Sequence, residues 1–411
     1  MSQGLFDGLR VIDAASFVAA PAAATLMADF GADVIKIEPP GGDAYRWSYL
    51  VPGQPVPEHN HYWMMGSRNK RSLALDLKSP DGLEILERLL DTADVFITNF
   101  PLSVRRRLKI GYEDVSRSRP RLIYASFTAY GETGPEVEKP GYDATSYWAR
   151  SGLMDLMRAN EDAEPLRPVA GLGDNPCGVT LYAAIVSALY RRAQTGLGGQ
   201  VGASLLAGGL WTNSLVVQAA LCGNPIAPRQ PRETVRSACN NTYRCRDGRW
   251  INIMILDEDR RFLPLLRAIG RQDLAEDARF ATRDNRQNNT PELIAIFDRE
   301  FSTRDLSAWR KNLDAAGITF DIVGTLADIA QDPQMRAIGA LIPYADNPDL
   351  LTIGSPFELD GIEKVSPRAA PGLGEHSEDV LREAGYSAAE IQRLLASRVV
   401  IKPEPAIPSP A

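Results

Sequence analysis

The sequence has 411 residues, which at about 150 residues per domain predicts two to three domains. Its composition, 44% hydrophobic and 24% charged, is that of an ordinary folded protein. The 45 basic and 52 acidic residues give a net charge of −7, which argues against binding nucleic acid or anionic membranes through overall charge. No apolar run reaches the roughly 18 residues of a membrane span, and the start, MSQGLFDGLRVID, lacks the regions of a signal peptide. We therefore expect a cytoplasmic protein with no membrane or nucleic-acid partner.

Cysteine and histidine are both scarce. The four cysteines form no CxxC pair, which argues against a disulfide scaffold or a thiol redox motif. Three histidines disfavour a histidine-based hydrolase triad. His59 and His61 have no cluster of Cys, Asp or Glu nearby in sequence, so we interpret them as part of a solvated loop and expect no metal. A cytoplasmic enzyme or ligand-binding protein remains.

Short apolar runs alternate with helical patterns through the first 130 residues. Strands are predicted at residues 10–13, 34–38, 94–98 and 122–127, and helices at 21–30 and from Ser79 to about 90, where Ser-Pro-Asp is a good helix start. This alternation predicts an α/β fold with a mainly parallel sheet. Ligands of such sheets bind beyond the carboxyl ends of strands, so the candidate loops follow Asp13, Glu38, Thr98 and Phe127. No GxGxxG follows the first strand, and we expect no nicotinamide cofactor.

The rest of the chain predicts a second, smaller domain. A helix is predicted over 179–192, with Val179, Ala183, Val186 and Tyr190 on its apolar face and glycines ending it. A hairpin turning at Asp247-Gly248 precedes further helices. We predict, in chain order, a large domain over 1–205, a linker over 206–236, a small α+β domain over 237–330, a return linker over 331–365, and a segment over 366–411 that completes the large domain and ends in a disordered tail.

Basic residues cluster twice. Arg68, Lys70 and Arg71, with Lys78, form one cluster, and residues 105–109 form the other. Such runs are commonly solvated faces, but guanidinium and ammonium groups beside a strand end also suit the phosphates of a polyanionic small ligand. Phe100, next to a strand end, could supply a stacking face for an adenine.

The segment GLGDNPCG at residues 171–178 also has two interpretations. Asp174 or Asn175 could cap the following helix, with Pro176 in its first turn. Alternatively, Asp174 is a nucleophile: the helix dipole would keep its carboxylate ionised, and the glycines would leave room for a bulky electrophile and expose N–H groups to a developing oxyanion.

Several long motifs occur together in a recognisable order. They are GLRVIDAASFVAAPAAATLMADFGADVIKIEPPGGDAYR, NKRSLALDLKSPDG, ADVFITNF, RLIYASFTAYGETGP, GLGDNPCG, TGLGGQ and PGLGEHSEDVL. In this order they resemble the class III coenzyme A transferases, the CaiB/BaiF family that includes formyl-CoA transferase. The resemblance covers nearly the whole chain and favours the nucleophile over the cap.

The resemblance implies a Rossmann-like large domain, a smaller α+β domain and two chains interlocked as a homodimer. Coenzyme A would be the co-substrate, with an acyl-CoA and a carboxylic acid as partners. The family's catalytic aspartate falls on Asp174. Coenzyme A contacts are implied at Val18, Leu75, Lys78, Asn99, Phe100, Arg107 and Leu108, and the acyl pocket is expected at Arg46, Trp47, Tyr142, Asp143 and Trp148.

The mechanism implied by this family is covalent. The Asp174 carboxylate attacks the donor thioester to give a mixed anhydride, the released thiolate converts it to an aspartyl-CoA thioester, and an incoming acid reverses these steps. Three positions differ from the family pattern: Val18 replaces a glutamine, and Pro39 and Pro140 replace basic residues. There is also no counterpart near Cys239 of the glycine-rich loop of formyl-CoA transferase. These differences concern the substrates, formyl-CoA and oxalate, rather than the reaction class.

Two alternatives remain. The α-methylacyl-CoA racemases resemble this sequence too, but would require a histidine where Tyr142 stands and a glutamate where Asn241 stands, and neither residue is a competent base near neutral pH. The other alternative is a non-catalytic subunit of a heteromeric transferase, against which the retention of Asp174 speaks.

Overall fold

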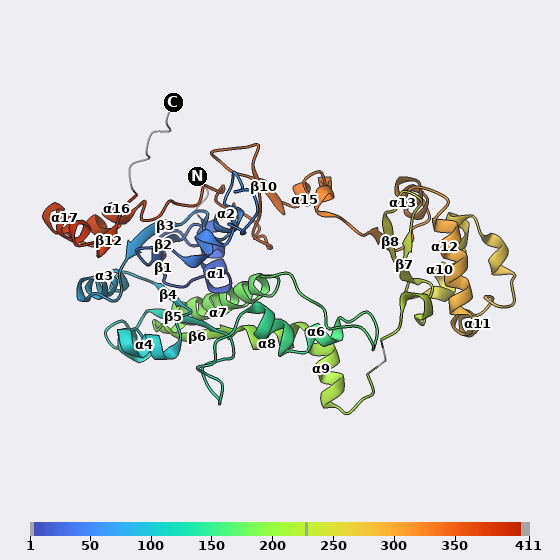
Figure 1. Cartoon of the computed structure of the whole chain (residues 1–411), viewed down its shortest axis with the longest axis horizontal. Coiled ribbons are helices and arrows are strands. Elements are labelled where there is room, and N and C mark those ends of the chain that lie inside the picture. The colour runs from blue at the N-terminus through green and yellow to red at the C-terminus, as the bar shows by residue number, and fades with distance from the viewer. Residues whose placement is uncertain (1–3, 227–228, 404–411) are drawn as a thin grey trace. The chain divides into compact units, whose positions relative to one another are not determined.

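The computed structural model describes residues 4–226 and 229–403, and the chain divides into two compact units (Figure 1). The large unit comprises Met1–Leu156, Arg167–Asn224 and Pro333–Ala411, and the small unit Met157–Leu166 and Pro225–Asp332. The predicted linker over 206–236 is largely helical, and its first part belongs to the large unit. The predicted return linker over 331–365 also contains regular structure of that unit. Residues 404–411 of the predicted disordered tail lie outside the described residues.

A seven-stranded sheet forms the centre of the large unit. Across the sheet its strands are β12 (Val400–Ile401), β3 (Arg71–Leu75), β2 (Asp33–Glu38), β1 (Arg10–Asp13), β4 (Val95–Thr98), β5 (Ile123–Thr128) and β6 (Gly199–Ser204). All neighbours pair in parallel except β12 with β3. The predicted α/β fold with a mainly parallel sheet is therefore confirmed.

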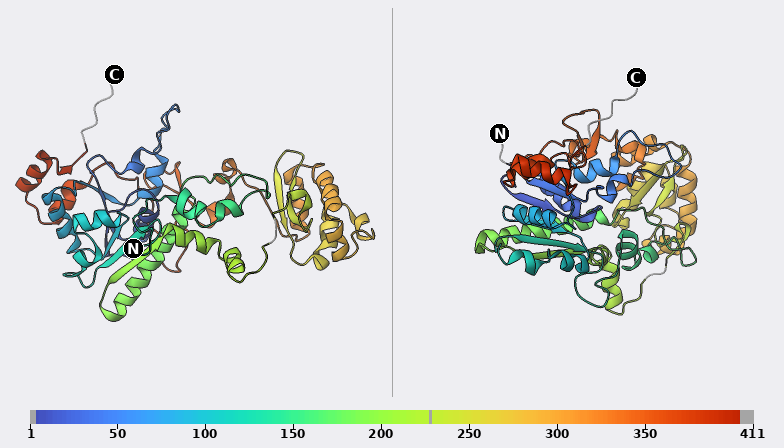
Figure 2. Two further views of the ribbon diagram at one scale, coloured as in Figure 1. Left: turned by 60° about the horizontal axis from the view of Figure 1, so that its bottom comes forward. Right: turned by 60° about the vertical axis from the view of Figure 1, so that its left-hand side comes forward.

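Successive residues of each strand bury on opposite faces of this sheet, because side chains alternate along a strand. Val11 packs into a core with α1 (Ala19–Asp29) and α7 (Asp174–Thr195). The next residue, Ile12, packs into a second core with α3 (Pro80–Leu90), α16 (Ser377–Glu383) and α17 (Ala388–Ala396). Figures 1 and 2 show red α16 and α17 beside the blue strands, so helices from late in the sequence cover strands from its beginning.

The large unit contains further elements besides this sheet and the helices named above. They are η1 (Ala44–Trp47), α2 (His61–Ser67), α4 (Leu102–Leu108), α5 (Tyr112–Ser116), the π-helix η2 (Asp143–Ala149), α6 (Leu153–Leu156), α8 (Leu205–Thr212), α9 (Ser214–Leu221), α15 (Pro333–Ala337), and the hairpin of β10 (Leu341–Pro343) and β11 (Leu351–Ile353). Among the described residues, no helix is long and apolar enough to cross a membrane.

The small unit has an antiparallel three-stranded sheet of β7 (Asn240–Arg244), β8 (Trp250–Met254) and β9 (Phe320–Ile322). Its other elements are η3 (Arg232–Thr234), α10 (Glu258–Ile269), η4 (Gln272–Ala275), α11 (Arg283–Asn288), α12 (Thr290–Phe301), α13 (Leu306–Ala315) and α14 (Leu326–Ile329). Alternate residues of β7 and β8, such as Tyr243 and Ile251, bury against these helices in a separate core. The predicted hairpin with its turn at Asp247-Gly248 is confirmed.

Helix α7 differs from its prediction at one end and on one face. It begins at Asp174, five residues earlier than expected, and ends at Thr195, where Gly196 takes a left-handed conformation with φ of 76°. The buried face is formed by Cys177, Gly178, Leu181, Tyr182 and Ile185. The predicted face was correct in part: Val179 and Val186 pack against the core, whereas Ala183 and Tyr190 are exposed. The shift follows from Gly178, since a Cβ there would lie 2.7 Å from the Ala19 carbonyl oxygen, so only glycine allows this approach to α1.

Strand β3 was not predicted, because its first residue belongs to a run of charged residues that we interpreted as a basic cluster. The structure shows why these charges are compatible with a sheet. Arg71 forms ion pairs with Asp33 at 2.7 Å and with Glu383 at 2.7 Å, at the edge of the strand away from the cavity described below.

Candidate active site

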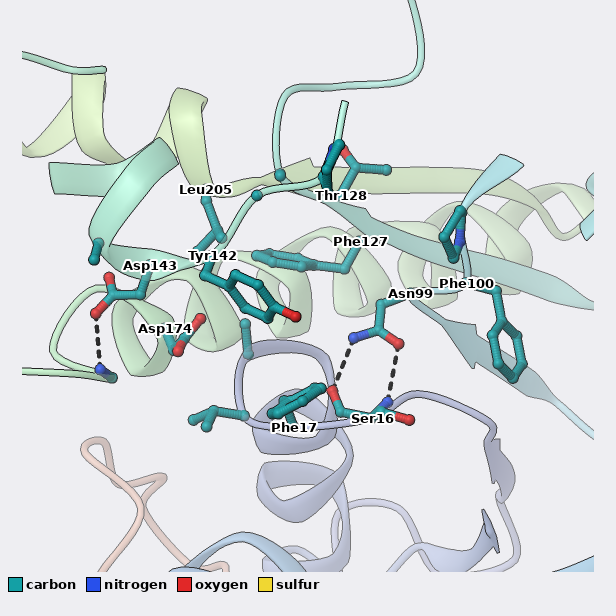
Figure 3. Close-up of a pocket in the computed structure, with 18 of the residues that line it drawn as sticks. Ser16, Phe17, Asn99, Phe100, Phe127, Thr128, Tyr142, Asp143, Asp174 and Leu205 are labelled. Carbon is teal, nitrogen blue, oxygen red and sulfur yellow. Dashed lines mark hydrogen bonds between the residues drawn. The ribbon is translucent and has the colours of Figure 1, made fainter. Parts of the chain in front are cut away.

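A cavity of about 700 Å³ lies in the large unit, beyond the carboxyl ends of the parallel strands (Figure 3). All four loops predicted to bind a ligand contribute to its lining. Phe17 follows β1, Tyr45 follows β2, Asn99 follows β4, and Thr128 ends β5. Because β1 pairs with β2 on one side and with β4 on the other, this is the point where the strand order reverses, and open α/β sheets bind ligands there.

Asp174 lines this cavity from the first residue of α7. The capping interpretation is wrong, since Gly173 holds the N-cap position and no side chain caps the helix. Burial, and after it the nearby negative charge of Asp143, together raise the pKa of Asp174 to about 7. We expected the helix dipole to keep this carboxylate ionised, but burial and the second carboxylate outweigh that effect.

Asp143 holds the loop that leads into Asp174. Its Oδ2 accepts a hydrogen bond from the Gly171 N–H at 2.8 Å (Figure 3). Its Oδ1 accepts one from the Gly173 N–H at 3.1 Å. A Cβ on Gly173 would overlap with Asp143 and with the ring of Tyr147, so only glycine fits at this position. These N–H groups are consequently not free to stabilise an oxyanion, which corrects the role that the sequence suggested for the glycines.

Two side chains fix the loop between β1 and α1. The Asn99 Oδ1 accepts a hydrogen bond from the Ser16 N–H at 2.9 Å, and its Nδ2 donates one to the Ser16 carbonyl at 2.8 Å. Phe17 takes a left-handed conformation, with φ of 65°, and its N–H donates to Asp43 Oδ1 at 3.3 Å. Its ring meets the edge of Tyr142 at 5.9 Å between centroids, in the centre of the cavity view (Figure 3).

Buried ion pairs lie beneath this loop. Lys70 contacts Asp13 at 2.9 Å, and Lys36 contacts Asp43 at 3.0 Å and Asp13 at 3.9 Å. Burial alone would raise the pKa of Asp13, but the charges of Lys36 and Lys70 reverse the shift and lower it. The strand ends are thus tied together by charges that have no access to solvent.

Arg68 and Lys70 of the first basic cluster form neither a solvated face nor a free phosphate pocket. Arg68 is buried and bound through two nitrogens to Asp29, at 3.0 and 2.7 Å, while Lys70 belongs to the buried pairs above. In the second cluster, Arg105 and Arg106 pair with acidic residues. Lys78 and Arg107 are exposed and, within residues 4–226 and 229–403, form no ion pair.

The residues predicted for the site fall into two groups. The cavity brings together Val18, Asn99, Phe100, Tyr142, Asp143 and Asp174. It does not include Leu75, Lys78, Arg107, Leu108, Arg46, Trp47 and Trp148. Leu75 and Leu108 are core residues, and Arg46 is buried against Glu38 at 2.6 and 2.7 Å and over the Trp63 ring. Asn241 lies in β7 of the small unit.

Several cavity residues were missed, among them Phe17, Tyr45, Tyr62, Phe127 and Leu205. In sequence they resemble core residues, and only for Phe17 and Leu205 could a position just after a strand have indicated otherwise. Among the residues that the structure describes, no three His, Cys, Asp or Glu side chains gather into a group suited to a metal.

Comparison with known proteins places this cavity in context. Residues 6–377 match the family described as CoA-transferase family III. The chain is 31% identical to (R)-2-hydroxy-4-methylpentanoate CoA-transferase of Clostridioides difficile, with 96% of this chain and 99% of the relative covered. It is also 31% identical to cinnamoyl-CoA:phenyllactate CoA-transferase of Clostridium sporogenes, covering 95% and 96%. A crystal structure of a CaiB/BaiF family protein from Brucella suis superposes with a TM-score of 0.82 at 29% identity, covering 93% of this chain and 100% of that one.

Proposed function

Because the chain belongs to CoA-transferase family III and is an enzyme that transfers coenzyme A, we propose that Asp174 is its covalent nucleophile. The observation that carries this proposal is the position of the carboxylate. Asp174 is the aspartate of the GLGDNPCG motif, and it lines a cavity formed by the loops at the carboxyl ends of the strands. The same site also contains Asn99 and Phe100, the residues proposed to contact coenzyme A.

The proposed reaction exchanges one activated acyl bond for another. An oxygen of the Asp174 carboxylate attacks the carbonyl carbon of an acyl-CoA, and the C–S bond breaks to give an acyl–aspartyl anhydride and a thiolate. The thiolate then attacks the aspartyl carbonyl, which releases the donor acid as a carboxylate and leaves an aspartyl-CoA thioester. An acceptor carboxylate displaces the thiolate to form a new anhydride, and attack of the thiolate on the acceptor's acyl carbon yields the new acyl-CoA and restores Asp174.

The protein contributes position and exclusion of water to these steps. The thiolate must remain near the anhydride, and holding two reactants in place can lower a barrier by about 7–11 kcal/mol. Asp143 supports this by fixing the loop before Asp174 through two backbone hydrogen bonds. Burial of Asp174, which raises its pKa, also favours the uncharged anhydride and thioester over the free carboxylate.

We propose that coenzyme A binds along the cavity and also contacts residues outside it. Val18, Asn99 and Phe100 would contact it inside the cavity, and Leu75, Lys78, Arg107 and Leu108 outside. Lys78 and Arg107 are the exposed cations suited to its phosphates. The proposed acyl pocket comprises Tyr142 and Asp143 together with Trp47 and Trp148. Arg46 is the residue least suited to bind an acyl group there, because Glu38 already neutralises its charge.

We further propose that the enzyme is an interlocked homodimer. Apolar side chains of α8 and α9 support self-association, since Trp211, Leu215 and Leu221 are largely exposed in the single chain and α9 has no buried residue. Exposed apolar surface of this kind is characteristic of protein–protein interfaces. Sedimentation equilibrium of the purified chain tests this, and a monomer at micromolar concentration would contradict it.

Trapping the enzyme-bound acyl group tests the nucleophile. Incubation with an acyl-CoA and hydroxylamine should convert Asp174 to a hydroxamate, detected by mass spectrometry of the peptide that contains it. The Asp174→Ala variant should lose both transfer and labelling while keeping its affinity for coenzyme A. Substantial turnover by that variant would overturn the mechanism.

A further inference from the structure

Aromatic rings surround the nucleophile. Phe17 and Tyr142 form one edge-to-face pair. Their side chains are 40% and 62% exposed, whereas large aromatic rings are usually mostly buried. Tyr45 and Tyr62 form a second pair, with centroids 5.2 Å apart and planes at 70°. All four rings line the cavity that holds Asp174.

Tyr45 lies within electrostatic reach of the nucleophile. Burial, then Tyr62, then the charge of Asp174 together raise the pKa of Tyr45 to about 12, so this phenol stays neutral during the reaction. Two pairs of rings therefore line the cavity around Asp174. Phe17 follows β1 and pairs with Tyr142, which precedes η2. Tyr45 follows β2 and pairs with Tyr62 of α2.

The charges of the same cavity are almost all negative. Of the described side chains that line it, Glu138, Asp143 and Asp174 are acidic and Lys139 alone is cationic; Glu138 is paired with Arg106, which leaves Asp143 and Asp174 as the carboxylates without a cationic partner. Lys139 is already neutralised by Glu136 at 2.9 Å and lies over the ring of Tyr130 at 5.3 Å. A second carboxylate on a bound acyl group would face these acidic groups without a free cation among the lining side chains, which is costly in a partly desolvated site.

We infer, on the basis of the proposed function, that the acyl groups transferred by this enzyme are uncharged and apolar, with a branched or aromatic chain that packs among Phe17, Tyr142, Tyr45 and Tyr62. The substrates are thus monocarboxylic acids, and dicarboxylic acids such as succinate and glutarate are poor substrates. Apolar pockets with aromatic walls favour such chains through buried area and ring contacts.

The half-reaction that loads Asp174 tests this inference without knowledge of the natural acceptor. The rate of hydroxamate formation is measured with 3-phenylpropanoyl-CoA, 4-methylpentanoyl-CoA, succinyl-CoA and glutaryl-CoA at equal ionic strength. We expect kcat/KM to be at least about tenfold higher for the two apolar thioesters than for the two that carry a carboxylate. Equal or faster labelling by glutaryl-CoA would overturn the inference while leaving the nucleophile intact. Labelling by none of the four would instead refute the proposed function.

Variants of Tyr142 locate the preference. Tyr142→Ala should lower the ratio of kcat/KM for 3-phenylpropanoyl-CoA over acetyl-CoA by about fivefold, because an aromatic contact is lost. Tyr142→Phe keeps the ring and should keep the ratio. Tyr190→Ala, which removes an exposed tyrosine of α7 outside the cavity, is the matched control. An unchanged ratio in Tyr142→Ala, in a protein that melts at the wild-type temperature, would contradict the assignment of this ring to the acyl group.

Discussion

The side-chain amide of Asn99 and the backbone of Ser16 are joined by two hydrogen bonds, one in each direction, at 2.9 and 2.8 Å. They connect the turn after β4 to the loop after β1, so two walls of the cavity depend on one side chain. Asn99→Ala removes both bonds, and Asn99→Asp places a carboxylate against the Ser16 carbonyl oxygen.

We expect KM for acyl-CoA to rise in both variants, and by up to about 30-fold in Asn99→Ala, since the two lost hydrogen bonds contribute about 1 kcal/mol each. The increase should be larger in Asn99→Asp because its carboxylate repels the carbonyl. Initial rates over a range of acyl-CoA concentrations measure this. A smaller effect of Asp than of Ala would show that the amide acts on the substrate directly rather than through Ser16.

The pH dependence of transfer should reflect Asp174. The ionised carboxylate is the nucleophile, and its pKa is about 7. On a logarithmic plot, kcat/KM should therefore rise with unit slope below pH 7 and level off above it. Asp143→Asn removes the neighbouring negative charge, so the pKa of Asp174 should fall and the rising limb should move to lower pH.

Glu113→Gln, an exposed change on α5, is the control for this shift. The midpoint of the profile is the quantity to compare, because Asp143 also holds the loop before Asp174 and its replacement can slow turnover at every pH. A rising limb that stays in place in Asp143→Asn would exclude the Asp143 charge as a cause of the raised pKa.

Stability should respond to the same titration in the opposite sense to activity. The pKa of Asp174 is raised from 3.8 in the unfolded chain to about 7 in the folded state, so folding favours the protonated form. The folded state therefore loses stability as pH rises from about 4 to 7 and keeps that deficit above 7. Asp174→Asn, which cannot ionise, should be more stable than wild type at pH 8, by an amount on the order of 1–4 kcal/mol, and close to wild type at pH 4. Chemical denaturation at the two pH values measures the difference, and equal stability at pH 8 would argue against a buried ionised Asp174.

Lys70 and Lys78 belong to one predicted basic cluster but should have different roles, Lys70 in stability and Lys78 in binding acyl-CoA. Lys70→Met leaves the buried Asp13 short of a partner, and loss of one member of a buried pair costs about 3–5 kcal/mol. Lys78→Met removes an exposed charge and should change the free energy of unfolding by less than about 0.5 kcal/mol. When the two variants are compared as folded protein, Lys78→Met should raise KM for acyl-CoA and Lys70→Met should not. A fully stable Lys70→Met protein would contradict the structural role assigned to this lysine.

Local patterns predicted β1, β2, β4 and β5 of the seven-stranded sheet and helices such as α1, α3 and most of α7, because alternation and capping are properties of neighbouring residues. Ser79 caps α3 as expected, through a hydrogen bond from the Gly82 N–H at 3.0 Å. Long-range pairs were beyond such patterns. Lys70 and Asp13 are 57 residues apart, so the cluster containing Lys70 resembled a solvated face until the fold brought them together.

The same limit applies to the site. Asp143 and Asp174 could each be named from the motifs, but not the hydrogen bonds by which Asp143 holds the residues before Asp174, since those partners lie 28 and 30 residues away. Nor could the conformation of Phe17 be predicted, because only tertiary contacts keep a large residue in the left-handed region.

The left-handed backbone at Phe17 makes Phe17 and Tyr142, the paired rings of the cavity, unequal targets for redesign. A residue other than glycine costs about 1 kcal/mol or more in this region, so a library at position 17 would sample backbone relaxation together with pocket width, and glycine would be enriched for reasons unrelated to the substrate. Tyr142, with φ of −128°, has an extended backbone that any side chain tolerates. Selection for altered acid preference is therefore best begun at Tyr142, where a change in side-chain size reports on the substrate alone.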